Sequence, residues 1–124
     1  MARPHVLLCG IDNGRRFEQF RAAGFSVDQF ETEFDVVRWL LSGKSTDLIC
    51  VLEAEHRAVE ETTMALVKNY TEVPLVLFRA SHRFNRNGLW SLEVLPMTPA
   101  GDWLRGIQDL IGLRRSAGYP SPVM

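Results

Sequence analysis

The 124-residue sequence predicts one α/β domain built on a parallel sheet. Continuous apolar runs of four or five residues recur along the chain, as expected for strands that are covered on both faces. Segments with helical periodicity separate these runs and are long enough to connect parallel strands by crossovers. We therefore expect five strands with helices on both faces of the sheet, and no second domain.

The first strand–helix–strand unit is predicted over residues 6–30. Residues 6–9 (Val-Leu-Leu-Cys) form a continuous apolar run, which indicates a buried strand. Residues 15–23 place two phenylalanines three positions apart, on one stripe of a helix, and Gly24 stands where a helix commonly ends. Apolar and polar side chains alternate over 25–30, which predicts a second strand near an edge of the sheet.

A second helix is expected to begin at Thr32, which can cap it, and to end before Gly43. Asp35 falls in its first turn, where a negative charge is favourable. Its core-facing stripe is predicted to consist of Phe34, Val37, Leu40 and Leu41. Residues 48–52 are apolar throughout and predict a central third strand.

The third helix is predicted over residues 54–70. Its apolar face is expected to contain Val59, Thr63, Leu66, Val67 and Tyr70. Pro74 precedes a fourth strand over 75–78. The polar segment 81–88 has room for one turn of helix at most, and a fifth strand is expected over 92–95.

Thr98 followed by Pro99 predicts the start of the last helix, because threonine caps helices and proline is favoured at the first helical position. Apolar positions then continue at helical spacing through Trp103, Leu104, Ile107, Leu110 and Ile111. Residues 114–124 contain Gly, Ser and two Pro, and we expect them to form a flexible tail. The predicted domain therefore covers residues 1–113.

Charge and composition exclude several classes of function. Fourteen basic and fifteen acidic side chains leave a net charge of −1, which does not favour binding to nucleic acid. The apolar runs are far shorter than the roughly 20 residues of a membrane helix, and residues 1–4 show no signal-peptide core. We expect a cytoplasmic protein without membrane or direct nucleic-acid contacts, in which Cys9 and Cys50 are reduced and buried.

Several segments, in their order and spacing, resemble the receiver (CheY-like) domains of response regulators. The second strand, second helix and third strand of a receiver resemble segments 24–27, 33–40 and 46–51 of this sequence. Its fifth strand and Lys-Pro-Phe junction resemble Leu95-Pro96-Met97, and its last helix resembles the segment with Trp103, Leu104 and Ile107. The resemblance covers most of residues 5–112. It implies a flavodoxin-like strand order of 2-1-3-4-5, with the fourth helix shortened or absent.

The chemistry of the receiver family depends on five positions, and none of them carries the required residue here. The resemblance places the magnesium-binding acidic pair on Gly10 and Ile11, and Asp12 follows one position later. It places the phosphoacceptor aspartate on Leu52, the threonine or serine on Arg79, and the lysine on Leu95. A leucine cannot form an acyl phosphate. Glu53 is adjacent, but its side chain is expected on the other face of the strand.

We therefore predict a signalling module of the two-component type that is not phosphorylated, is not an enzyme, and uses no metal or cofactor. It would act through a protein partner or a second copy, on the face formed by the fifth strand and the last helix. Phe84, Trp90 and Leu92 are expected to be exposed there. Arg79, at the end of a central strand, needs a carboxylate, which Asp12 or Glu53 could supply.

A small enzyme is the second interpretation. Cys9 and Arg15 are separated by five residues between a strand and a helix, which resembles the phosphate loop of low-molecular-weight tyrosine phosphatases and arsenate reductases. A helix N-terminus and an arginine would lower the pKa of the thiol and bind an oxyanion. Asp12 inside the loop and Arg16 after the arginine count against this interpretation. In the simpler alternative, Cys9 is a small buried apolar side chain.

Overall fold

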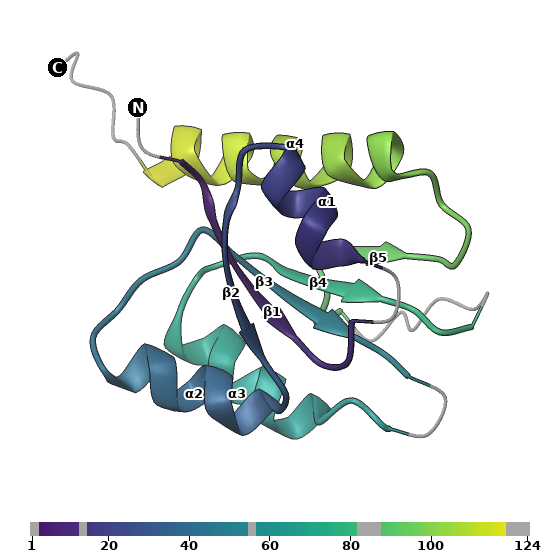
Figure 1. Cartoon of the computed structure of the whole chain (residues 1–124). Coiled ribbons are helices and arrows are strands. Elements are labelled where there is room, and N and C mark those ends of the chain that lie inside the picture. The colour runs from purple at the N-terminus through teal and green to yellow at the C-terminus, as the bar shows by residue number, and fades with distance from the viewer. Residues whose placement is uncertain (1–2, 13–14, 55–56, 82–87, 119–124) are drawn as a thin grey trace, which may run out of the picture.

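The structure is a computed structural model that describes residues 3–12, 15–54, 57–81 and 88–118, with the backbone alone for 114–118. It contains a five-stranded parallel sheet in the order β2-β1-β3-β4-β5, which confirms the flavodoxin-like arrangement (Figure 1). The elements are β1 (His5–Cys9), α1 (Arg16–Ala22), β2 (Ser26–Phe30), α2 (Glu33–Leu41), β3 (Leu48–Leu52), α3 (Glu61–Tyr70), β4 (Leu75–Phe78), β5 (Leu92–Val94) and α4 (Ala100–Gly118).

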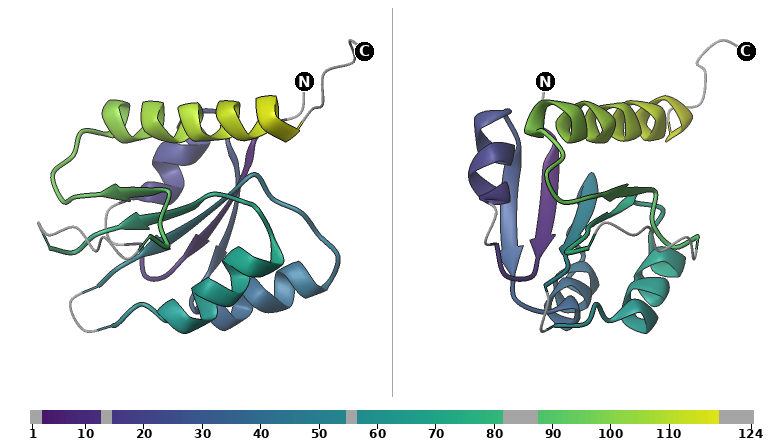
Figure 2. Two further views of the ribbon diagram at one scale, coloured as in Figure 1. Left: turned by 180° about the vertical axis from the view of Figure 1, so that it is seen from behind. Right: turned by 90° about the vertical axis from the view of Figure 1, so that its right-hand side faces the viewer.

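Two helical layers cover the sheet: α1 and α4 lie on one face, and α2 and α3 on the other (Figure 2). The strands alternate between two apolar clusters, one beneath each layer. Val6 and Leu8 of β1 point toward α1 and α4, whereas Leu7 and Cys9 point toward α2 and α3. All residues of β3 and β4 are buried in the same way, as their continuous apolar runs predict.

Aromatic rings form the centre of the layer that contains α1 and α4. The ring of Phe20 lies 5.2 Å from that of Phe25 and 5.1 Å from that of Trp103, measured between centroids. Phe78 meets Trp103 edge-on at 5.1 Å. Such tilted and edge-to-face contacts are the favoured geometries for aromatic pairs, and they connect α1, the residue before β2, β4 and α4.

The core-facing stripe of α2 differs from the prediction. Thr32 caps the helix as expected, and its side-chain oxygen accepts a hydrogen bond from the backbone N–H of Asp35. However, the buried residues are Glu33, Val36 and Leu40, whereas Phe34 and Leu41 are 64% and 65% exposed. Two stripes of this helix fit the helical period, and the buried one includes a carboxylate that finds a partner, as described below.

The third helix is shorter than predicted and turns a different side to the core. It begins at Glu61 rather than at residue 54, because the chain after β3 first folds into a turn in which the N–H of Arg57 donates to the carbonyl of Ala54. Its buried residues are Met64 and Val67. Two residues predicted to face the core are instead exposed, Leu66 by 64% and Tyr70 by 62%.

Two further differences concern the C-terminal third. Between β4 and β5, the described residues 79–81 and 88–91 contain no helix, and Phe84 falls in the part that the structure does not describe. The last helix continues to Gly118, so the prediction of a tail was wrong for 114–118; no proline interrupts the helix before Pro120. No helix in the described ranges combines the length and the apolar character needed to cross a membrane.

We predict that Phe20→Ala lowers the free energy of unfolding by about 3–5 kcal/mol, because it leaves a cavity among the three rings that Phe20 contacts. Urea unfolding followed by tryptophan fluorescence measures the change. Phe34→Ala is the matched control: its ring is exposed, so its effect should stay within about 0.5 kcal/mol. Equal losses for the two variants would contradict the described layering.

Candidate functional site

The candidate site lies at the carboxyl edge of the sheet, where β1, β3 and β4 end. In open α/β sheets, ligands bind outside the carboxyl ends of the strands, near the point where the strand order reverses. In the order β2-β1-β3-β4-β5 that point lies between β1 and β3. The predicted receiver-site positions all lie at this edge or just beyond it.

Gly10, the first position of the expected acidic pair, has a backbone that only glycine adopts readily. Its φ is +118°, and its N–H donates to the carbonyl of Phe30 at 2.8 Å. A Cβ atom at this position would lie 2.8 Å from the carbonyl oxygen of Leu52. A carboxylate side chain is therefore not accommodated where β1 ends beside β3.

The other two positions after β1 do not offer a free carboxylate either. The side chain of Ile11 is apolar and 58% exposed. Asp12 accepts the backbone N–H groups of Arg16 at 2.8 Å and Phe17 at 2.9 Å, one on each oxygen. The aspartate thereby satisfies the first donors of α1, as a capping residue does.

Leu52, at the acceptor position, is 5% exposed and belongs to the apolar cluster beneath α1 and α4. Leu95, at the lysine position, follows β5 and is half-buried. Neither a leucine at the predicted acceptor position nor one at the predicted lysine position can form an acyl phosphate or carry a positive charge.

Arg79 and Glu53 form an ion pair across β3 and β4 at this edge. Nη1 of Arg79 lies 3.0 Å from Oε2 of Glu53, and the other oxygen of Glu53 accepts the N–H of Ala80 at 2.8 Å. Nε of Arg79 lies 3.9 Å from a carboxylate oxygen of Glu93 in β5, and Nη2 donates to Ser81. Of the two partners predicted for Arg79, Glu53 is the one observed.

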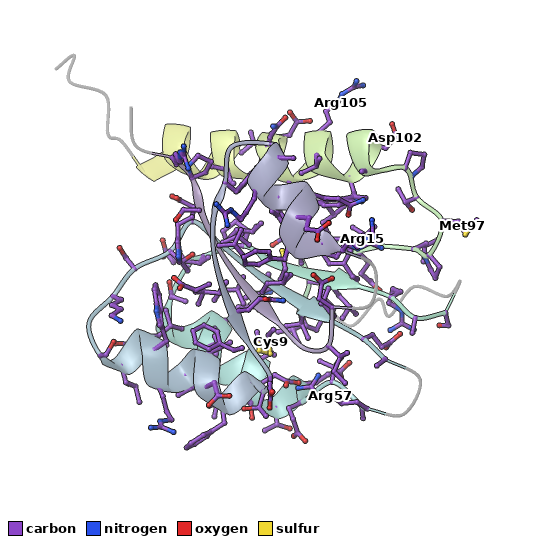
Figure 3. All side chains as sticks on the ribbon, viewed as in Figure 1. Cys9, Arg15, Arg57, Met97, Asp102 and Arg105 are labelled. Carbon is purple, nitrogen blue, oxygen red and sulfur yellow. The ribbon has the colours of Figure 1, made fainter. Side chains whose placement is uncertain are left out.

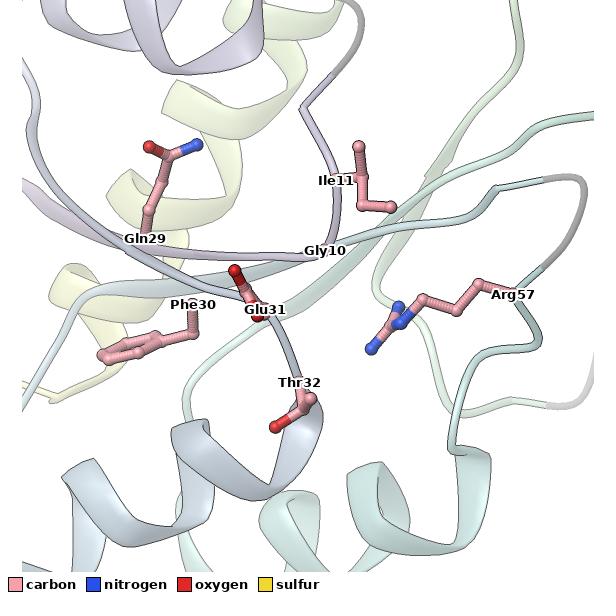
Figure 4. A pocket seen from close by; sticks show the side chains of 7 residues that line it. All are labelled: Gly10, Ile11, Gln29, Phe30, Glu31, Thr32 and Arg57. Carbon is pink, nitrogen blue, oxygen red and sulfur yellow. The ribbon is translucent and has the colours of Figure 1, made fainter.

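A second ion pair borders an open pocket of about 690 Å³, which Figure 4 shows from close by. The pocket is lined by Gly10, Ile11, Gln29, Phe30, Glu31, Thr32 and Arg57. The guanidinium of Arg57 pairs with Glu33, a carboxylate that is only 1% exposed. The second oxygen of Glu33 accepts the N–H of Glu60 at 2.6 Å, so this buried charge is fully hydrogen-bonded.

The Glu33–Arg57 pair was not predicted from the sequence, although the sequence contains a signal for it. Glu33 precedes Val36, Val37 and Leu40 by three, four and seven positions, which is the spacing of one helical stripe. A glutamate on an apolar stripe predicts a buried ion pair. The stripe that begins at Phe34 is entirely apolar, so it was chosen as the core-facing stripe and the ion pair of Glu33 was not predicted.

Cys9 is buried on the opposite face of the sheet from Arg15 (Figure 3). Its S–H donates to Oε1 of Glu33 at 3.7 Å. Burial, reinforced by the charge of Glu33, raises the pKa of the Cys9 thiol to about 12. A phosphatase needs the opposite shift and an arginine beside the thiolate. The geometry therefore does not support the enzyme interpretation based on Cys9 and Arg15, and the prediction of buried thiols is confirmed for Cys9 and Cys50.

The residues predicted to form an apolar interface do not gather on one face. Trp90 is half-buried against the cluster beneath α2 and α3, whereas Leu92 is half-buried against the cluster beneath α1 and α4. Phe84 lies outside the described residues. In the described ranges, no three His, Cys, Asp or Glu side chains are grouped so that they could hold a metal ion.

Comparison with known proteins identifies the fold. No protein-family model matches the chain, and no curated protein matches it in sequence. Solved structures of receiver domains do match in shape. One is the N-terminal domain of a response regulator/sensory box/GGDEF three-domain protein from Carboxydothermus hydrogenoformans, with 14% identity, a TM-score of 0.76, and coverage of 93% of this chain and 99% of that chain.

Two further receiver structures agree with it. The signal receiver domain of an HD domain-containing protein from Pseudomonas fluorescens Pf-5 is 13% identical, with a TM-score of 0.75 and coverage of 93% of this chain and 99% of that chain. The chemotaxis response regulator CheY4 of Vibrio cholerae is 11% identical, with a TM-score of 0.69 and coverage of 88% and 99%. The chain therefore has the fold of a CheY-like receiver domain.

We predict that Arg79→Ala destabilises the fold by about 1–3 kcal/mol, because it leaves the half-buried carboxylates of Glu53 and Glu93 without this cation. Urea unfolding measures the loss. Arg105→Ala is the control, since Arg105 is exposed on α4 and its removal should change stability by no more than about 0.5 kcal/mol. An Arg79→Ala protein as stable as the wild type would show that the ion pair contributes nothing.

A second prediction concerns the thiols. Because the pKa of Cys9 is raised to about 12 and that of Cys50 is raised by complete burial, both thiols stay protonated in the folded protein at neutral pH. Iodoacetamide should label neither cysteine of the native protein and both after unfolding, as counted by intact mass. Stabilisation from the protonated thiols should be lost as the pH rises from about 9 toward 12. Rapid native labelling of Cys9 would contradict the assignment.

Proposed function

We propose that this chain is a receiver-like signalling module of the two-component type that takes no phosphoryl group and acts by binding other proteins. The observation behind this proposal is that the side chains at the carboxyl ends of the strands are either apolar or already hydrogen-bonded. Leu52 stands buried in the acceptor position, and both oxygens of the neighbouring Glu53 are hydrogen-bonded, one to Arg79 and one to the N–H of Ala80.

Magnesium would also find no ready ligands at this edge. A receiver-type metal needs several oxygen ligands at short range. Gly10 and Ile11 provide no side-chain oxygen, and both oxygens of Asp12 already accept N–H groups of α1. Binding a cation through Asp12 would therefore remove the cap of that helix. Phosphoryl transfer also needs positive charge to neutralise the charge that develops, and the described guanidinium groups at this edge, those of Arg57 and Arg79, are already paired with carboxylates.

The fold, and the domain composition of proteins that share it, support a role in binding. Two of the similar structures are domains of larger proteins, one with sensory box and GGDEF parts and the other with an HD domain. In such proteins a receiver fold operates next to other domains. We propose that the present chain likewise contacts a protein partner or a second copy of itself.

One candidate contact surface remains the face formed by β5 and α4. Trp90 and Leu92 do not form it, because both are half-buried in separate clusters. Apolar side chains are nevertheless exposed there, namely Met97 at 89% after β5 and Leu113 at 70% on α4. These two residues replace the predicted ones as the places to test this face.

We predict that acetyl phosphate with magnesium leaves the intact mass of the protein unchanged. The reason is that Leu52 cannot accept a phosphoryl group and that the carboxylates of Glu53 and Asp12 are already hydrogen-bonded. A phosphorylatable receiver treated in the same reaction serves as the positive control. A mass increase of one phosphoryl group would overturn the proposal, and its loss in Glu53→Gln would identify Glu53 as the acceptor.

A further inference from the structure

β2 is an edge strand whose outer side is open. The order β2-β1-β3-β4-β5 places it at one end of the sheet, and in Figure 1 it lies in front of the other strands over its full length. At the opposite edge β5 has only three residues, whereas β2 has five, which pair with β1 one to one and without a bulge. A regular edge strand of this length is a template for another strand.

The hydrogen bonds to β1 show which backbone groups of β2 point outward. The N–H of Ser26 donates to a carbonyl just before β1 at 2.9 Å, and the carbonyl of Phe30 accepts an N–H just after β1 at 2.8 Å. Because alternate residues of a strand bond to the same neighbour, Asp28 faces β1 as well. The N–H and C=O groups of Val27 and Gln29 therefore point away from the sheet. In the described part of the chain, no group forms a hydrogen bond with them.

β2 lacks the features that usually protect an edge strand. Natural edges are protected by lysine or proline, by a bulge, or by a covering segment. Residues 26–30 contain no lysine, arginine or proline, and their one charged side chain, Asp28, is bonded to Nε2 of His5 at 2.7 Å. The backbone of β2 is therefore able to pair along its outer side.

The side chains around the outer side of β2 are mainly acidic. Asp28 lies in the strand, and the exposed Glu31 follows it. Asp35 lies one helical turn before Trp39, on the same side of α2. That side faces β2, because the ring of Trp39 stacks at 5.4 Å on His5, the partner of Asp28. Three carboxylates thus lie along the middle and the carboxyl end of this edge.

Basic side chains do not balance these carboxylates. Residues 22–37 contain no lysine or arginine. Lys44 and Arg3 lie at the amino end of the sheet, before β3 and β1 respectively. At the carboxyl end, the guanidinium of Arg57 is already paired with Glu33. The edge therefore favours a basic strand over a second copy of β2, which carries the same acidic side chains.

We infer that the outer side of β2 binds an extended basic segment of a partner protein, which adds a sixth strand to the sheet. The outward N–H and C=O groups of Val27 and Gln29 bond to the backbone of this segment, and its side chains alternate between the two faces. Lysine or arginine on the α2 side meets Asp28 and Asp35. Apolar residues on the α1 side pack beside Val27, which borders the apolar cluster there.

This inference names a partner chemistry for the proposed interaction module, and it rests on that proposal only in assuming that the protein works by binding. The two can fail separately. Phosphorylation by acetyl phosphate would overturn the proposed function and leave the β2 contact standing. Absence of peptide binding would overturn the β2 contact and leave the absence of phosphoryl transfer standing.

Nuclear magnetic resonance of the isotope-labelled full chain tests the inference. The probe is the peptide acetyl-Lys-Val-Lys-Val-Lys-Val-amide. The amide signals of Val27 and Gln29 should shift when this peptide is added, and their N–H groups should become protected from hydrogen exchange. The same peptide with glutamate in place of lysine should bind roughly tenfold more weakly or less, because it repels the carboxylates of the edge.

A proline variant separates backbone pairing from side-chain contact. Gln29→Pro removes one outward N–H and leaves the hydrogen bonds to β1 in place, since proline is tolerated on the outer side of an edge strand. It should raise the dissociation constant of the lysine peptide roughly tenfold or more. The matched control Gln29→Ala keeps the N–H and should change that constant by less than about threefold. Urea unfolding verifies that each variant is folded.

A charge variant provides a second test that does not alter the backbone. Glu31→Lys should weaken binding of the lysine peptide several-fold. Glu72→Lys makes the same change at an exposed position just before β4, which β1 and β3 separate from β2, and should leave binding unchanged.

Several results would overturn the inference. They are no binding of the lysine peptide, equal binding of the two peptides, and binding that neither Gln29→Pro nor Glu31→Lys weakens. Without peptide, protection of the Val27 and Gln29 amides that rises with protein concentration would also overturn it, because a second copy would then be the occupant of this edge.

Discussion

The three central strands have no side that touches water, and the rest of the structure follows from this constraint. Every residue of β3 and β4, and Val6 to Cys9 of β1, is buried. Apolar side chains on both faces require a helical layer on each, which α1 with α4 and α2 with α3 provide. Because the interior accepts no unpaired charge, the polar groups at the strand ends must find partners among themselves.

That requirement accounts for the chemistry at the carboxyl edge. The same position in a sheet can hold carboxylates that are free to bind a cation, or carboxylates that stabilise the protein. Here Glu53 binds Arg79, Glu33 binds Arg57, and Asp12 caps α1. The two ion pairs link residues that are 24 and 26 positions apart in the sequence, whereas Asp12 ties the end of β1 to the helix that follows it. The carboxylates at this edge therefore connect strands and helices to one another, although the same residue types act in catalysis in other proteins.

The sequence determines the sheet more clearly than the helix faces. Runs such as 48–52 fit only a strand buried on both faces, so strand positions and order could be predicted. On α2, one stripe contains Phe34 and Leu41 and another contains Glu33 and Val36, and both fit a helix. Periodicity does not distinguish them, because the choice depends on Arg57 reaching Glu33 from another element. The pair of Arg79 with Glu53 could be expected from topology, whereas the bond between Cys9 and Glu33 depends on packing that no local pattern shows.

The backbone of Gly10 bears on the evolutionary routes open to this sequence. A carboxylate there would place a Cβ atom 2.8 Å from the carbonyl of Leu52, on a backbone with a φ of +118°. An aspartate in place of Leu52 would enter an apolar cluster while still lacking a metal to bind. Each step toward phosphotransfer therefore lowers stability before any step returns activity. Selection acting on one substitution at a time would therefore meet a fitness valley at this edge.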